Sequence, residues 1–200
     1  MRAALRHPAA WWALLVLGCL PWAWLLAQTL LDQLGPNPAE ALIRATGDWT
    51  LRSLCVVLAV TPLRTWLGWP ELLRFRRLLG LLVFGYASLH MLCYVWFDMG
   101  FDPADTLQDV LKRPFIWLGF SAFVILWALA ATSFNRAVRW LGGKRWQMLH
   151  LGVYGVAVLA VLHFWWMRAG KQDFAEVLVY AGILVVLLGW RLLRRSARRP

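Results

Sequence analysis

Three histidines lie inside long apolar stretches of this chain, where a polar ring is costly. His150 and His163 stand thirteen residues apart in "RWQMLHLGVYGVAVLAVLHFWW", and His90 ends the apolar run "LLGLLVFGYASLH". An imidazole inside a helix bundle either hydrogen-bonds a neighbouring helix or serves a functional site. Because hardly any carboxylate accompanies these rings, a proton or ion pathway is disfavoured. The leading hypothesis is that neutral imidazole nitrogens ligate haem iron between helices.

Depth decides which histidines can share one iron atom. Counted from the predicted inner membrane surface, His150 lies roughly 6 Å deep, His90 roughly 20 Å deep and His163 roughly 26 Å deep. His90 and His163 are therefore within about 6 Å of the same height, a gap that helix tilt can absorb. We predict that these two histidines are the axial ligands of one haem in the outer half of the membrane.

His150 is left over, and its spacing from His163 suggests a second haem roughly 20 Å nearer the inner face. Thirteen residues turn a helix about 140° away from a common face, so this second site needs a bend or another approach angle. Arg77 stands thirteen residues before His90. Its guanidinium stays charged and cannot ligate iron, but it can pair with haem propionates. His150 and Arg77 are thus further candidate cofactor-binding residues, with His150 a candidate iron ligand, and the haem count stays open between one and two.

The composition places these rings in a membrane protein. The 200-residue chain is 61% hydrophobic and 16% charged, which is more apolar than a water-soluble domain of this size needs. Its apolar runs are close to the ~20 residues that cross a bilayer. We therefore predict one all-α domain over residues 1–200, a bundle of six transmembrane helices joined by short loops. The predicted helices lie near residues 9–31, 50–68, 78–97, 115–134, 148–167 and 175–191.

The orientation of the bundle follows from its basic residues. Of the 21 Lys and Arg residues, fifteen fall on one side of the predicted helices and six on the other. The six are Arg44, Arg52, Lys112, Arg113, Arg168 and Lys171. Every acidic residue except Glu71 also falls on the side with fewer basic ones. By the positive-inside rule both termini are cytoplasmic, and the net charge of +11 reflects membrane topology instead of nucleic-acid binding.

Four stretches of the chain resemble a known family. They are "RFRRLLGLLVFGYASLH" (74–90), "LGGKRWQMLHLGVYGVAVLAVLHF" (141–164), "TPL" (61–63) and "LKRPFIWLG" (111–119). Together they resemble the MsrQ (YedZ) family, the haem-binding membrane subunits of bacterial MsrPQ protein-methionine-sulfoxide reductase systems, within the ferric-reductase-like transmembrane superfamily. The resemblance spans all six predicted helices. It implies a b-type cytochrome of the bacterial inner membrane, with haem on histidines that match His90, His150 and His163.

The resemblance also implies cofactors and partners. Members of the family receive electrons on the cytoplasmic side, with FMN implicated and a flavin reductase or quinone as donor. They pass electrons to MsrP, a periplasmic molybdenum-cofactor enzyme that reduces methionine sulfoxide in oxidised proteins. Sulfoxide chemistry would then belong to the partner, and this chain would be an electron-transfer subunit without catalytic residues of its own. No G-x-G-x-x-G motif opens a helix after a strand, so FMN rests on the resemblance alone.

The chain departs from the NADPH oxidases of the same superfamily in two respects. Its third predicted helix carries one histidine instead of two, which bears on the haem count, and no flavin or nicotinamide domain follows the sixth. Two other functions therefore stay open. One is a membrane cytochrome b of another type, such as a ferric reductase or the anchor subunit of a different periplasmic oxidoreductase. The other is a cofactor-free transporter or scaffold.

Two charged surfaces are candidates for docking. The acidic stretch Asp98–Asp109 would face the periplasmic enzyme, unless it is simply a solvated loop. Basic residues of the inner loops could hold a flavin phosphate or an acidic donor, although topology explains the same charges. These basic residues are Arg74, Arg76, Arg77, Arg136, Arg139, Lys144 and Arg145.

Overall fold

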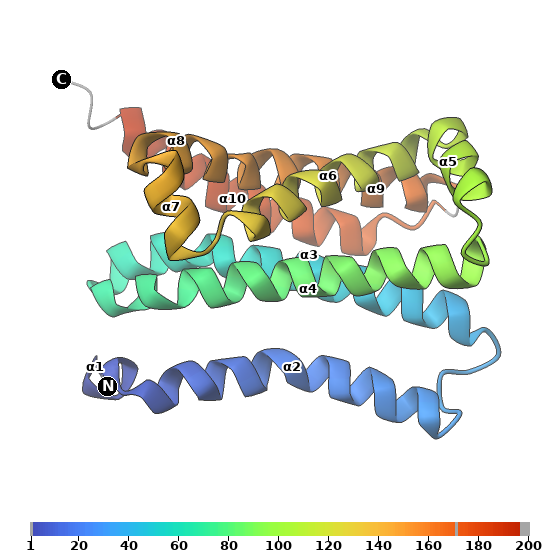
Figure 1. Cartoon of the computed structure of the whole chain (residues 1–200), viewed down its shortest axis with the longest axis horizontal. Helices are drawn as coiled ribbons and strands as arrows, with labels where there is room; N and C mark the ends of the chain where they lie inside the picture. The colour runs from blue at the N-terminus through green and yellow to red at the C-terminus, as the bar shows by residue number, and fades with distance from the viewer. Residues whose placement is uncertain (1, 171, 197–200) are drawn as a thin grey trace. The chain divides into compact units, whose positions relative to one another are not determined.

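The computed structural model of the chain describes residues 2–170 and 172–196, with side chains through Arg194. Within these residues every regular element is a helix (Figure 1), which confirms the predicted all-α class. Lys171, Arg198 and Arg199, which entered the charge count, lie outside the described residues. The helices gather into two compact units, residues 1–100 and 101–200, and each is described by itself. The single domain over residues 1–200 stays a prediction.

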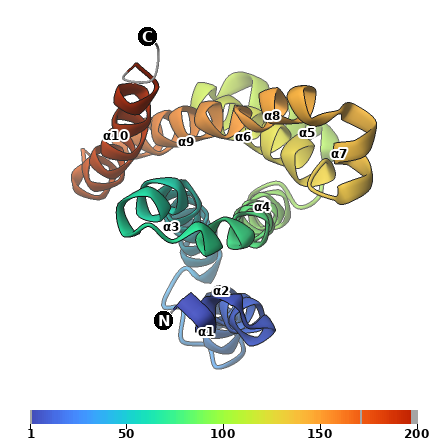
Figure 2. The same ribbon diagram turned by 90° about the vertical axis from the view of Figure 1, so that its left-hand side faces the viewer.

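The first unit is built on an antiparallel pair of long helices, α3 and α4. Its elements are α1 (Arg2–Arg6), α2 (Pro8–Leu30), α3 (Pro38–Leu67), the 3-10 helix η1 (Pro70–Phe75), α4 (Arg76–Cys93) and the π-helix η2 (Tyr94–Asp98). Helices α3 and α4 lie alongside each other in both views (Figures 1 and 2). The chain reverses between them at Gly68, whose φ of 65° is a left-handed conformation that glycine adopts without steric cost.

Apolar packing and a few polar contacts hold the first unit together. Its core includes Val60 of α3 and Leu82 of α4, against which side chains of α2 pack. The buried Tyr86 donates its hydroxyl hydrogen to the carbonyl oxygen of Gly18 at 2.7 Å, which ties α4 to α2. His7, for which the sequence suggests no role, caps α2 by accepting a hydrogen bond from the backbone N–H of Ala9.

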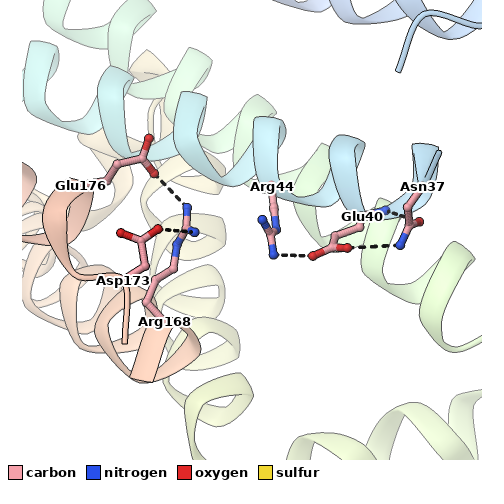
Figure 3. A network of polar contacts seen from close by, with 6 residues as sticks. All are labelled: Asn37, Glu40, Arg44, Arg168, Asp173 and Glu176. Atoms are coloured by element: carbon pink, nitrogen blue, oxygen red, sulfur yellow. Dashed lines mark hydrogen bonds and ion pairs between the residues drawn. The ribbon is translucent and has the colours of Figure 1, made fainter. Parts of the chain in front are cut away.

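The second unit contains a similar antiparallel pair, α6 and α9. Its elements are α5 (Pro103–Lys112), α6 (Pro114–Ala131), α7 (Asn135–Leu141), α8 (Gly143–His150), α9 (Gly152–Ala169) and α10 (Ala175–Ser196). Helices α6 and α9 make the main packing contact of this unit. Near the end of α9, Arg168 forms ion pairs with Asp173 at 3.2 Å and with Glu176 of α10 at 2.8 Å (Figure 3). These pairs fix the turn between α9 and α10.

The second predicted helix begins earlier than expected. Helix α3 starts at Pro38 instead of near residue 50, because Asn37 caps it by accepting a hydrogen bond from the N–H of Glu40 at 3.2 Å. The carboxylate of Glu40 also pairs with Arg44 one turn later (Figure 3). Such capping and i,i+4 pairing stabilise polar helical turns that a search for apolar runs does not detect.

The expectation of short loops is wrong at two other connections. Helix α5 fills the segment between α4 and α6, and Asp102 caps it by accepting hydrogen bonds from the N–H groups of Ala104 at 2.7 Å and Asp105 at 3.0 Å. Helices α7 and α8 fill most of the segment between α6 and α9. Both connections are therefore mostly helical, which apolar periodicity does not reveal.

Five helical stretches among the described residues are long and apolar enough to cross a membrane. They are Pro8–Leu30, Pro70–Asp98, Pro114–Ala131, Gly143–Ala169 and Ala175–Arg194. Their outward side chains are apolar, with Leu30 of α2 76% exposed and Val185 of α10 69% exposed, as lipid-facing residues should be. Helix α3 is not among the five, because Glu40, Arg44, Asp48 and Arg52 make its first half polar. The chain is thus a multi-pass membrane protein, while the sixth crossing and the side of each terminus stay predictions.

We expect α3 to be the sixth crossing, because it is about 45 Å long and packs against the spanning helix α4. Six crossings put both termini on one side, and five put them on opposite sides. Fluorescent-protein fusions, which fold only in the cytoplasm, should therefore be bright at either end of the chain. Alkaline phosphatase inserted at Gly100 should be active, and the same insertion at Gly142 should be inactive. A dark fusion at one terminus only would show that α3 does not cross.

Candidate haem site

His90 lies near the end of α4 and is held by the backbone of α3. Its Nδ1 atom is 2.9 Å from the carbonyl oxygen of Ile43, in the second turn of α3. The hydroxyl oxygen of the buried Thr46 lies 3.5 Å from the same nitrogen. The ring is therefore fixed against the first turns of the neighbouring helix, and it is only partly exposed.

His163 is held in the same way within the second unit. Its Nδ1 atom lies 2.6 Å from the carbonyl oxygen of Phe115, in the first turn of α6. The ring of Phe115 also lies close, with its centroid 6.1 Å from that of the imidazole. As with His90, the histidine sits near the end of the second helix of an antiparallel pair and contacts the beginning of the first.

These two hydrogen bonds determine which ring nitrogen carries the proton. A carbonyl oxygen can only accept, so Nδ1 of both His90 and His163 must be the donor. In a neutral imidazole the lone pair then belongs to Nε2, the nitrogen farther from the backbone. This is the arrangement found in metal-ligating histidines, where a hydrogen bond to one ring nitrogen fixes the tautomer and the orientation of the other.

The donor set fits haem. Iron in b-type haem is bound by neutral imidazole nitrogens, and no third or fourth protein ligand is needed because the porphyrin supplies the rest. Among the described residues no group of three or more His, Cys, Asp or Glu side chains could hold a bare metal ion. Haem is therefore a better match to His90 and His163 than a metal ion bound by side chains alone.

His150 is held differently, by a side chain instead of a carbonyl. Its Nε2 atom lies 3.3 Å from the hydroxyl oxygen of Thr132, and its ring stacks on Trp146 with centroids 4.0 Å apart. The Thr132 hydroxyl donates its one hydrogen to the carbonyl oxygen of Ala128 at 2.8 Å. With that hydrogen in place, the hydroxyl oxygen accepts from Nε2–H of His150. The lone pair of this imidazole is then on Nδ1, the ring nitrogen nearer its own backbone.

Helix α6 separates the two histidines of the second unit. His163 contacts Phe115 in its first turn, whereas His150 contacts Thr132 directly after its last residue. Phe115 and Thr132 are about 25 Å apart along the helix axis. His150 and His163 therefore cannot ligate the same iron atom. The predicted pairing of His90 with His163 joins residues of different units and stays a prediction.

Arg77 lies in the first turn of α4 and is exposed. It stands about 20 Å from His90 along this helix, near the opposite end of α4. If Arg77 binds a propionate, as predicted, the haem concerned is the inner one.

Some residues of both docking surfaces have structural partners. Arg74 donates hydrogen bonds to the carbonyl oxygens of Leu5 at 2.9 Å and Arg6 at 2.6 Å. In the acidic stretch, Asp102 caps α5 and Asp109 forms an ion pair with Arg113 at 2.8 Å. These contacts account for part of each charged cluster without a bound partner.

The sequence gives no sign of the groups that hold the three rings. The acceptors for His90 and His163 are backbone carbonyls, which every residue carries, so nothing marks Ile43 and Phe115 as special. Thr132 and Trp146 are also unremarkable, since a hydroxyl and an indole at a helix end have several ordinary roles. Only the pairing of helices, which requires the fold, reveals these contacts.

Comparison with known proteins shows the family to which the chain belongs. The family described as "Ferric reductase like transmembrane component" matches residues 46–161, which include His90 and His150. A protein of Polaromonas naphthalenivorans named "Protein-methionine-sulfoxide reductase heme-binding subunit MsrQ" is 59% identical over 194 residues, covering 97% of this chain and 89% of the relative. No solved structure matches the chain significantly.

Relatives with the same name occur in other bacteria. The protein of Bordetella parapertussis is 53% identical over 193 residues, covering 93% of this chain and 92% of the relative. That of Xanthomonas campestris is 45% identical over 177 residues, covering 88% and 80%. The similarity thus covers most of this chain and most of each relative.

The hydrogen bonds predict different tautomers for the three histidines. In protein produced without haem, His90 and His163 should carry the proton on Nδ1, and His150 should carry it on Nε2. Two-bond nitrogen–proton correlation spectra of protein labelled with 15N-histidine distinguish the two forms, and single His→Gln variants assign the signals. One common tautomer for all three rings would contradict this geometry.

Proposed function

Because the chain belongs to the MsrQ family of haem-binding subunits of protein-methionine-sulfoxide reductase, within the ferric-reductase-like transmembrane proteins, we propose that it carries electrons across the bacterial inner membrane. The donor would be a cytoplasmic flavin- or quinone-linked reductase. The acceptor would be a periplasmic molybdenum enzyme of the MsrP type, which reduces methionine sulfoxide in oxidised proteins. The sulfoxide chemistry would take place on that partner.

One observation carries the proposal: His90 and His163 each direct Nδ1 to a carbonyl of the neighbouring helix. The lone pair of Nε2 in both rings is then available to iron, and these two histidines would together hold one haem b. Haem, when bound, supplies a carrier that accepts and releases one electron at a time. The residues around it supply ligands, orientation and an apolar barrier to water and protons.

The inner half of the membrane would hold the second candidate site. His150 and Arg77 are the residues proposed for it, the first as an iron ligand and the second as a propionate partner. His150 would have to release Thr132 and turn its ring before Nε2 could ligate iron. FMN, which the resemblance implies, is proposed as part of the donor side without assigned residues.

Haem binding is tested by replacing each histidine. His90→Ala and His163→Ala should each lose most of the Soret absorbance of the detergent-solubilised protein, because each removes one of the two axial ligands. His150→Ala should retain the greater part, since it is not a ligand of the same iron. His7→Ala is the matched control. It should retain all of the Soret absorbance, because His7 caps α2 and is not proposed to bind haem.

The outcome distinguishes the rival functions. A purified wild-type protein without a Soret band, produced with ample haem, would support a transporter or scaffold and refute the proposal. Undiminished haem in both His90→Ala and His163→Ala would refute the assignment of ligands while leaving a cytochrome b in place.

Electron delivery is tested in bacteria that depend on methionine sulfoxide. Cells lacking their own system should grow with methionine sulfoxide as methionine source when this chain is produced together with an MsrP-type enzyme. The His163→Ala variant should fail to support growth at equal membrane abundance, because the acceptor would receive no electrons. Equal growth with the variant, or growth with the chain alone, would contradict the proposed partner.

A further inference from the structure

Two glycines lie directly against the histidine rings that are proposed to bind haem. A Cβ atom added to Gly47 would be 3.1 Å from Cε1 and 3.2 Å from Nδ1 of His90. One added to Gly119 would be 2.9 Å from both Cε1 and Nδ1 of His163. A side chain at Gly119 would therefore force the imidazole of His163 to shift, and one at Gly47 would require the imidazole of His90 to move by a few tenths of an ångström.

The two glycines occupy equivalent places. Gly47 follows Ile43 by four residues, and Gly119 follows Phe115 by four, so each glycine lies one turn after the carbonyl that accepts the hydrogen bond. The separation from carbonyl to histidine is 47 residues in the first unit and 48 in the second. The same arrangement of carbonyl, glycine and histidine thus occurs in two separate helix pairs, which argues against a chance contact.

We propose that Gly47 and Gly119 are positioning residues for haem, because the absence of a side chain lets each imidazole approach close enough to donate Nδ1–H to the carbonyl one turn earlier. The inference rests on the proposed function, in which His90 and His163 are axial ligands. The glycines themselves touch no iron. They act through the histidines, by holding the ring in the tautomer and orientation that present Nε2.

The alternative is that these glycines serve ordinary helix packing. Gly85 of α4 provides the comparison, since a Cβ there would be 2.8 Å from the ring of Trp22, which is crowded but involves no histidine. Gly80 of α4 and Gly155 of α9 provide the second comparison. A Cβ at either position would meet no heavy atom within 4 Å among the residues that the structure describes. Alanine also favours a helix more than glycine does, so substitution alone should not weaken these helices.

The experiment measures haem affinity in five alanine variants of the full chain. Gly119→Ala should bind haem on the order of 10-fold more weakly or worse, which is the usual effect of losing the hydrogen bond that orients a ligating histidine. Gly47→Ala should show a smaller loss, because its contact with the ring is looser. Gly80→Ala, Gly155→Ala and Gly85→Ala should bind like the wild type. Transfer of haem to a haem-scavenging protein gives the affinities, and circular dichroism verifies the helix content of each variant.

Two further measurements distinguish a loss of histidine positioning from a general effect on helix packing. The haem that remains in Gly47→Ala and Gly119→Ala should have a shifted midpoint potential, because the hydrogen bond from Nδ1 sets the basicity of the ligand. In haem-free protein, the Nδ1–H tautomer of the affected histidine should no longer be the single form. The controls should change neither property.

Two results would overturn the inference. Gly47→Ala and Gly119→Ala could both keep wild-type affinity, potential and tautomer while His90→Ala and His163→Ala lose haem, in which case the glycines do not position the ligands. Gly85→Ala could lose haem as strongly as Gly119→Ala, in which case the effect is one of packing. Retention of haem by both histidine variants is a different result, and it would refute the proposed ligands themselves.

Discussion

The candidate site depends on one interaction, the hydrogen bond from an imidazole Nδ1–H to a helix carbonyl. In the apolar interior of a membrane protein an unsatisfied N–H costs several kcal/mol. A helix carbonyl has a second lone pair beyond the one used by its own helix, so it can accept this additional bond. In both helix pairs the bond joins the second helix to the start of the first. The contact that helps to pair the helices is therefore the same contact that would orient each histidine in the proposed haem site.

This arrangement holds each proposed ligand from two sides. The carbonyl fixes the direction of Nδ1, and the glycine beneath the ring leaves the imidazole no gap to tilt into. A ligand prepared in this way needs little rearrangement when it binds, and the hydrogen bond also raises its basicity. Ligand basicity is one of the few means by which a protein adjusts the potential of a haem. On the proposed function, one hydrogen bond between two helices would thus contribute to fold, haem binding and redox behaviour together.

Much of the fold could be predicted from the apolar runs and the polar segments between them, because lipid imposes a strong and simple constraint on composition. The helices that contain His90, His150 and His163 are predicted from that pattern alone. The start of α3, the helices α5 and α7 and the first residues of α8 are not, since they lie outside the apolar runs. Asn37 caps α3 and Asp102 caps α5, and neither cap belongs to an apolar pattern. The histidines themselves are recognisable as polar residues within apolar stretches of the sequence. Their partners cannot be recognised in the sequence, because every residue has a backbone carbonyl and a glycine can occur for many different reasons.

The contrast between His150 and the other two rings follows from the chemistry of their partners. A carbonyl only accepts, so it holds His90 and His163 in one tautomer. A threonine hydroxyl can both donate and accept, so Thr132 holds His150 as the Nε2–H tautomer only while its own hydrogen stays on the carbonyl oxygen of Ala128. A fixed ring suits permanent coordination, which needs an unchanging ligand. An adaptable ring suits a site near a donor such as a flavin or quinone, whose reduction takes up protons together with electrons. On the proposed function, the two ends of α6 would thus match transfer from a proton-coupled donor to a purely electronic carrier.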